Sequence, residues 1–178
     1  MGLSSSLSAG RPSGLPDLLA PNLKVIFCGI NPGLRAAAQG HHFAGGGNRF
    51  WRVLHLAGFT PIQVLPERDR TILDYGYGLT TAVCRPTARA EDLAKSEFSN
   101  AADELAEKIR AFSPGRVAFL GKPAFATMYR KRLVEWGRQP EAIAGIEAWI
   151  LPNPSGLNRG FRLDDLVTAY QELHLAIK

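Results

Sequence analysis

The 178-residue sequence has few cysteines and no long apolar run. Two cysteines, Cys28 and Cys84, are too few for a disulfide framework or for an iron–sulfur cluster held by cysteines alone. No apolar run approaches the roughly 18 residues that span a bilayer. The N-terminal region lacks the basic start and continuous apolar stretch of a secretion signal. We therefore expect a protein of the reducing cytoplasm with no membrane partner.

Common cofactor and metal motifs are also missing. The glycine-rich segment at residues 29–33 (GINPG) fits neither GxGxxG nor GxxxxGK, which argues against a dinucleotide or triphosphate loop. The 4 histidines do not form a metal set, because His41 and His42 are adjacent and no second cluster accompanies them. We expect an activity that uses no metal and no cofactor.

Acidic residues are outnumbered, with 16 Asp and Glu against 21 Lys and Arg, which gives a formal net charge of +5. A positive excess favours a polyanionic partner such as DNA, because each neutralised phosphate releases condensed counterions. Charge alone indicates only the class of partner, since many basic proteins bind no nucleic acid.

Strand-like apolar runs alternate with helical patterns along the chain. We predict strands at residues 23–28, 116–120 and 148–151, with a weaker candidate at 79–83. Helices are predicted after Asn48, after Ser99, from Pro123 and over residues 163–177. Strands separated by helices pair in parallel, so the predicted fold is a three-layer α/β/α sandwich with a central, mostly parallel sheet.

The chain length favours one domain, which we place at residues 17–178 after a flexible tail at residues 1–16. Three loops rich in Gly, Pro and Asn directly follow predicted strands: residues 29–33 (GINPG), 121–123 (GKP) and 152–159 (PNPSGLNR). Ligands of parallel sheets bind outside the carboxyl ends of the strands, where such loops meet. Taken singly, the first and third loops are better explained as ordinary turns than as parts of a site.

Taken together, the motifs resemble one family. GINPG, Phe43-Ala44, the segment NRFW that begins at Asn48, and NPSGLNR follow in the order found in mismatch-specific uracil/thymine DNA glycosylases of the uracil-DNA glycosylase superfamily. The resemblance extends from about Asp17 to Ile177. It implies a monofunctional enzyme that flips uracil, and some modified pyrimidines, out of G-mispaired duplex DNA. Hydrolysis of the N-glycosidic bond would leave an abasic site for downstream enzymes, and a monomer is expected.

The resemblance also implies roles for individual residues. It makes Asn31 the group that orients the attacking water and Phe43 the ring that stacks on the extruded base. The other implied contacts are the pocket wall (Gly29, Ile30, Asn153) and the DNA wedge with its contacts to the opposite guanine (Gly156, Leu157, Arg159). Lys122 and Ser155 are the predicted phosphate contacts, Lys122 because it follows a strand at the same edge of the sheet as the other loops. An apolar wedge beside polar groups is a known way to unstack duplex DNA.

A second catalytic group is predicted at Asp92. The amide of Asn31 has no useful basicity, so it can position a water but hardly deprotonate it. Residues 91–98 (EDLAKSEF) resemble the eukaryotic thymine-glycosylase branch of the family, which makes Asp92 our candidate for the missing base. The alternative for Asp92 is a solvated acid near a helix start, where the helix dipole favours it.

Two features leave the substrate and the function open. Residues 45–47 are three glycines where bacterial relatives often carry His-Pro-Ala, and Ala36 replaces a small hydroxyl residue, so the substrate range is expected to be wider. Two other functions fit the sequence: a non-catalytic module that binds mismatches or lesions, and a hydrolase of free nucleosides.

Overall fold

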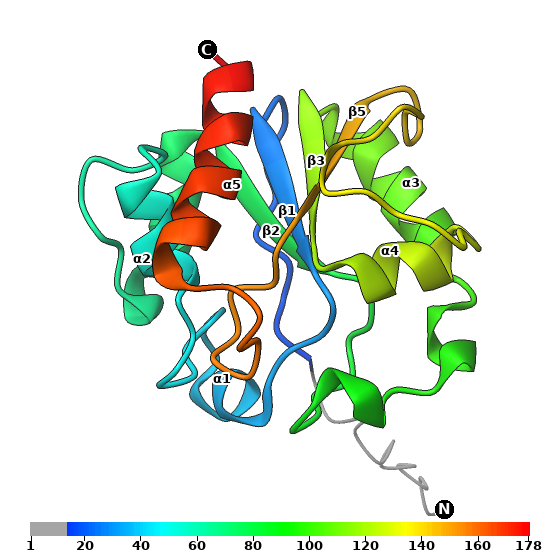
Figure 1. The fold of residues 1–178 in the computed structure, drawn as a ribbon, viewed down its shortest axis with the longest axis horizontal. Helices are drawn as coiled ribbons and strands as arrows, with labels where there is room; N and C mark the ends of the chain where they lie inside the picture. Colours follow the sequence, from blue (N-terminus) through cyan, green and yellow to red (C-terminus); the bar gives the residue numbers. More distant parts are fainter. Residues whose placement is uncertain (1–13) are drawn as a thin grey trace, which may run out of the picture.

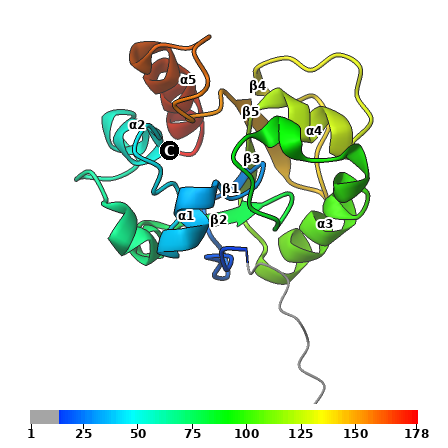
Figure 2. The ribbon, with the colours of Figure 1, turned by 90° about the horizontal axis from the view of Figure 1, so that it is seen from below.

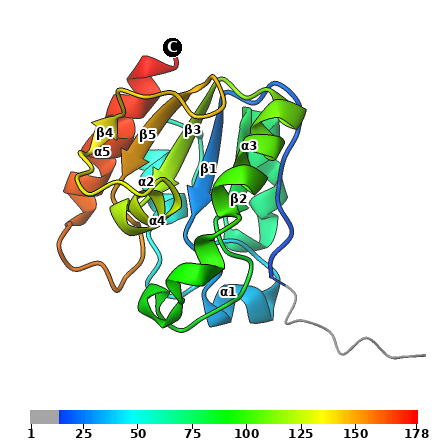
Figure 3. The same ribbon diagram turned by 90° about the vertical axis from the view of Figure 1, so that its right-hand side faces the viewer.

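Five strands form one sheet in the computed structural model, which describes residues 14–178. They are β1 (Val25–Gly29), β2 (Tyr77–Thr81), β3 (Arg116–Leu120), β4 (Gly137–Arg138) and β5 (Glu147–Leu151). Their order across the sheet is β2-β1-β3-β5-β4, which Figure 3 shows from the side. Only the β4–β5 pair is antiparallel, so the predicted mostly parallel sheet is confirmed.

Helices cover both faces of this sheet. They are α1 (Leu34–Gln39), α2 (Phe50–Leu56), α3 (Ala101–Phe112), α4 (Lys122–Met128) and α5 (Leu163–Ala176). Figure 1 shows α2 and α5 on one side of the sheet and α3 and α4 on the other, which confirms the three-layer sandwich. Short 3₁₀ helices at Pro66–Tyr75, Ala90–Asp92 and Lys95–Phe98 complete the connections.

Alternate residues of each central strand enter two separate cores. On β3, Ala118 and Leu120 pack with apolar residues of α2 and α5, whereas Val117 and Phe119 pack with those of α3 and α4. None of these four side chains is more than 2% exposed. A strand buried on both faces is nearly continuously apolar, which is why the sequence marks these strands so clearly.

The parallel strands end at one edge, which lies at the bottom of Figure 1 beside α1 and faces the viewer in Figure 2. The loops after β1, β2, β3 and β5 therefore meet there, as predicted.

The beginning of the described chain also reaches this edge. The Pro16 carbonyl accepts a hydrogen bond from Nε2 of His42 at 2.8 Å. Contacts with the domain thus begin before the boundary predicted at Asp17, and residues 1–13 of the predicted tail lie outside the described residues. Among residues 14–178, no helix is both long and apolar enough to cross a membrane.

Candidate active site

A cavity of about 390 Å³ opens at the carboxyl edge of the sheet. Most of its lining comes from four segments: the loop from β1 into α1, residues 42–48, residues 81–90 and the loop after β5. Leu15 and Leu120 complete it. It brings together eight of the residues predicted from sequence, from both motif loops: Gly29, Ile30, Asn31, Phe43, Asn153, Ser155, Gly156 and Leu157. Asn31 and Leu157, which are far apart in the sequence, therefore face the same cavity.

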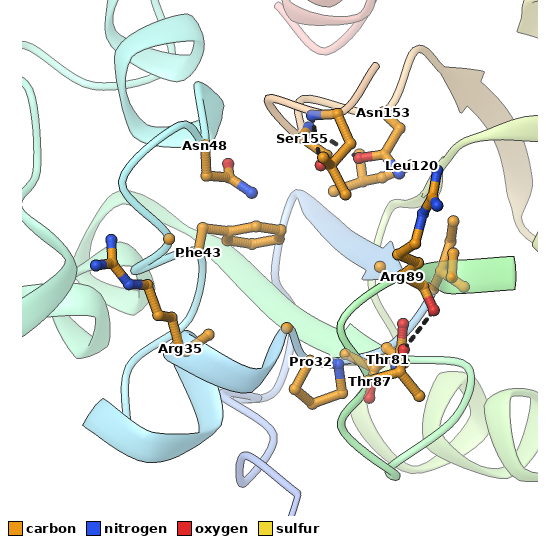
Figure 4. Close-up of a pocket in the computed structure, with 18 of the residues that line it drawn as sticks. Pro32, Arg35, Phe43, Asn48, Thr81, Thr87, Arg89, Leu120, Asn153 and Ser155 are labelled. Carbon is orange, nitrogen blue, oxygen red and sulfur yellow. Dashed lines mark hydrogen bonds between the residues drawn. The ribbon is translucent and has the colours of Figure 1, made fainter. Parts of the chain in front are cut away.

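The amide of Asn31 is held in one orientation by its neighbours. Its Nδ2 donates to the Arg85 carbonyl and to Oγ1 of Thr87, both at 2.8 Å. The Thr87 hydroxyl donates its own hydrogen to the Arg89 carbonyl at 2.7 Å, as Figure 4 shows, so its oxygen can only accept from Asn31. Both amide hydrogens are thereby used, and Oδ1 is the atom left to meet a ligand.

The segment after β2 is fixed to the GINPG loop by backbone bonds. The Ala82 and Val83 N–H groups donate to the Gly29 and Ile30 carbonyls at 2.9 and 3.0 Å. A further bond joins the Thr87 N–H to the Pro32 carbonyl at 3.2 Å. The parallel pairing of β1 and β2 is in this way prolonged past the strands, and it carries Thr87 to Asn31.

Phe43 projects into the cavity from a strained backbone. Its φ is +57°, a left-handed conformation that is uncommon for a residue with a side chain. The ring stacks on Phe50 with centroids 3.9 Å apart and planes at 23°. Figure 4 shows the Phe43 ring pointing into the cavity, so its second face is available to a flat ligand.

The preceding residue, His42, holds this backbone in place. Its N–H donates to Oδ2 of the buried Asp69 at 2.9 Å, and its carbonyl accepts from Nε1 of Trp51 at 3.0 Å. His42 itself is only 3% exposed. The surroundings thus over-determine the turn, which is the condition under which a strained conformation persists.

Two other asparagines complement Asn31. Oδ1 of Asn48 accepts from the Phe50 N–H at 2.9 Å, and Oδ1 of Asn153 accepts from the Ser155 N–H at 3.0 Å. With both oxygens used, and no partner for either Nδ2 among the described residues, these amides present N–H donors to the cavity. The site therefore combines one amide acceptor with two amide donors.

The cavity has a positive bias. Arg35 and Arg89 line it, on opposite sides in Figure 4, whereas no Asp, Glu or Lys is among its described lining residues. Within the described part of the chain, Arg89 forms an ion pair with Glu91 alone, at 4.0 Å, and both side chains are largely exposed. Such a cavity favours ligands that carry or develop negative charge.

The loop after β5 presents Leu157 outward. Its side chain is 67% exposed, beside the cavity that its residue lines. Gly156 packs directly on the backbone of Gly47, because a Cβ at Gly156 would lie 2.7 Å from the Gly47 carbonyl oxygen. Only glycine fits that position without a shift of either loop.

Three predicted site residues do not line the cavity. Asp92 is exposed, and its Oδ2 accepts from the Arg89 N–H at 3.0 Å, which caps the short 3₁₀ helix Ala90–Asp92. Nζ of Lys122 lies 4.5 Å from the ring centroid of Trp136, and Arg159 is exposed in the loop after β5. Their predicted roles stay predictions.

An ion pair supports the Asp92 segment. Nε and Nη2 of Arg85 donate to the two carboxylate oxygens of Glu97 at 2.6 and 2.9 Å. These bonds, with a bond from the Ala94 N–H, lower the pKa of Glu97 from 4.5 to about 2. Because the Arg85 carbonyl also accepts from Asn31, the pair helps to hold the cavity wall.

Some lining residues were not predicted as site residues. Among those with polar or charged side chains are Arg35, His42, Asn48, Thr87 and Arg89. Asn48 was visible as part of the NRFW motif, but nothing in the sequence indicated which atom faces a ligand. Thr87 reaches Asn31 across 56 residues of sequence, a contact that only the sheet topology creates.

Comparison with known proteins identifies the family of the chain. Residues 16–174 match the model of the uracil DNA glycosylase superfamily. The chain belongs to this superfamily. Membership supports a DNA glycosylase as the class of enzyme.

A solved structure shows the same fold. It is the solution NMR structure of a protein described as a candidate uracil DNA glycosylase, from Methanosarcina acetivorans. It matches with a TM-score of 0.63 and 20% sequence identity, over 92% of this chain and 98% of that one. At this identity the match supports the fold alone.

Proposed function

We propose that this chain is a monofunctional DNA glycosylase that everts uracil, and some modified pyrimidines, from G-mispaired duplex DNA and hydrolyses the N-glycosidic bond. One observation carries the proposal. A cavity with no Asp or Glu among its described lining residues holds an aromatic face and a fixed amide oxygen, and an exposed leucine lies at its edge. An everted base requires an aromatic face to stack on and a polar group that positions the attacking water. The gap that the base leaves in the duplex can be filled by the leucine.

The base would stack on Phe43, and its carbonyl oxygens would accept from the side-chain amides of Asn48 and Asn153. As the C1′–N1 bond breaks, its electron pair leaves with the base, which becomes negatively charged. Donors already oriented by Phe50 and Ser155 stabilise charge that appears only in the transition state. The absence of carboxylates among the described lining residues avoids opposing that charge.

Water would complete the reaction at the sugar. Oδ1 of Asn31 accepts a hydrogen bond from a water and so holds the water oxygen toward the anomeric carbon. The new C–O bond forms as the sugar loses its positive character, and the released proton passes to the departed base or to solvent. The Asn31 amide orients the water but cannot deprotonate it. This is sufficient when the C1′–N1 bond is largely broken before the water adds.

The proposal of a monofunctional enzyme rests on the lack of an amine nucleophile among the described residues that line the cavity. A glycosylase that also cleaves the strand forms a Schiff base through an amine nucleophile. No lysine is among the described lining residues, and Lys122 is engaged with Trp136. The abasic product would therefore leave intact, for downstream enzymes, from a protein that we propose acts as a monomer in the cytoplasm.

A duplex with one G:U pair tests the proposal against its rivals. Incubation followed by alkali should break the uracil strand at that position, because an abasic site is alkali-labile. Tight binding with an intact strand would instead identify a mismatch-binding module. Release of uracil from free deoxyuridine without strand breakage would identify a nucleoside hydrolase.

A further inference from the structure

Arg49 makes an unusual set of contacts with the loop after β5. Its guanidinium donates to four carbonyls: Phe161 at 2.7 Å from Nη1, Ser155 and Asn158 both at 2.9 Å from Nη2, and Pro154 at 3.3 Å from Nε. The Arg49 backbone N–H also donates to Pro154 at 3.0 Å. One half-buried side chain thus gathers the carbonyls on both sides of Leu157.

Other side chains also donate hydrogen bonds to the carbonyls of this loop. The Tyr170 hydroxyl, buried in α5, donates to the Pro152 carbonyl at 3.1 Å, and Nδ2 of Asn158 donates to the Asn153 carbonyl at 2.9 Å. With its carbonyls turned inward to these donors, the loop leaves the Leu157 side chain 67% exposed. The conformation that exposes Leu157 therefore depends on inward-facing donors, of which Arg49 supplies the most.

The same residue belongs to the side of the cavity that holds the base. Arg49 lies between Asn48, whose amide faces the cavity, and Phe50, on which Phe43 stacks. The planar fork of arginine can reach several acceptors at once, which an ammonium group does not reproduce. Arg49 thus joins the base-holding segment directly to the loop that carries Leu157, beside the packing of Gly47 on Gly156.

We propose that Arg49 is a positioning residue that couples these two segments, so that insertion of Leu157 into duplex DNA depends on Arg49 whereas bond cleavage does not. This inference rests on the proposed glycosylase function. It assigns to Arg49 no contact with DNA. Its effect should be large for a paired uracil, which must be everted, and small for a uracil that is already unpaired.

The test uses two substrates under single-turnover conditions: a G:U duplex and a duplex with uracil in an unpaired bubble. We expect Arg49→Met to slow cleavage of the G:U substrate about tenfold or more, the scale for losing hydrogen bonds to a charged group. Cleavage in the bubble should change less than about threefold, since no residue that lines the cavity is replaced. Arg49→Lys, which keeps the charge without the fork, should show the same selective loss.

Arg52→Met is the matched control, because Arg52 is exposed on α2 and makes no hydrogen bond or ion pair among the described residues. It should leave both rates unchanged. Thermal unfolding of each variant establishes that the fold is retained. Equal losses on both substrates for both Arg49 variants would overturn the coupling role.

A binding readout separates this inference from the proposed function. Fluorescence of 2-aminopurine stacked beside a non-cleavable 2′-fluoro-deoxyuridine in a G-mispaired duplex should rise on binding of the wild type, and much less with Arg49→Met. A wild type that cleaves neither substrate would refute the glycosylase. An equal fluorescence rise with both proteins would refute the role of Arg49.

Discussion

Both N–H groups of the Asn31 amide are committed to Arg85 and Thr87, so its oxygen is the group that a ligand meets. The orientation follows from the Thr87 hydroxyl, which gives its hydrogen to the Arg89 carbonyl and has only acceptor capacity left. These three short hydrogen bonds thereby make the Asn31 side chain an acceptor toward the cavity.

Asn31→Ala should lower the single-turnover rate constant on a G:U duplex by about a hundredfold, because it removes a preorganised contact to the reacting water. The dissociation constant for that duplex should change less than about threefold, since the residue holds water rather than DNA. Rapid-quench kinetics and fluorescence anisotropy measure the two quantities. Asn100→Ala, at the exposed start of α3, is the control. Parallel losses in rate and affinity would contradict the role of Asn31.

Asp92 has two possible roles that one isosteric change separates. In the structure its carboxylate accepts from the Arg89 N–H, and an asparagine can accept the same bond. We expect Asp92→Asn to retain single-turnover activity within about twofold and Asp92→Ala to lose somewhat more, because only the alanine removes the cap. A collapse of activity in both variants would instead support Asp92 as the general base, since amides lack basicity.

At the scale of elements, one wall of the cavity is formed by residues 87–90, which lead into the two 3₁₀ helices between β2 and α3. These helices are short, Phe98 is their one buried residue, and the Arg85–Glu97 ion pair joins the start of this segment to the second helix across 12 residues. Local structure of this kind depends on side-chain bonds more than on a buried apolar face.

The lowered pKa of Glu97 makes a pH prediction. Because the folded-state pKa, about 2, lies below the ordinary value of 4.5, the ion pair adds stability above pH 4.5 and loses it as pH falls toward 2. The melting temperature of Glu97→Gln should therefore lie below that of the wild type at pH 7, and the gap should close toward pH 3. The effect should be small, as for other exposed pairs. A gap that is constant with pH would contradict this assignment.

The elements that the sequence predicted are those with long apolar patterns. The three strong strands and the 14-residue α5 were found because burial leaves a regular apolar signature. The 6-residue α1 and the 2-residue β4 were missed, because neither is long enough to show a period.

The candidate site also has parts that the sequence indicates and parts that only the tertiary structure reveals. The GINPG and NPSGLNR loops stand out in the sequence, and the structure places them at one cavity. Which amide atom of each asparagine faces the cavity depends on tertiary contacts that no local pattern records. The same holds for the hydrogen bond from Arg49 to Phe161, which spans 112 residues.

For the whole molecule, the net charge of +5 and the two arginines at the cavity predict strong salt dependence of DNA binding. Each phosphate contact adds about 0.9 to the slope of log affinity against log salt. Arg35→Gln and Arg89→Gln should each reduce that slope by about this amount. Arg110→Gln, on the exposed face of α3 and outside the cavity lining, should leave it unchanged. Unchanged slopes in the first two variants would exclude both arginines from phosphate contact.

The structure of the protein bound to a G-mispaired duplex with non-cleavable 2′-fluoro-deoxyuridine is the most direct measurement. We expect the uracil ring against Phe43, a water between Oδ1 of Asn31 and the anomeric carbon, and Leu157 in the vacated position of the stack. A uracil that stays paired within the helix, or DNA bound on a face away from Asn31 and Leu157, would contradict the account.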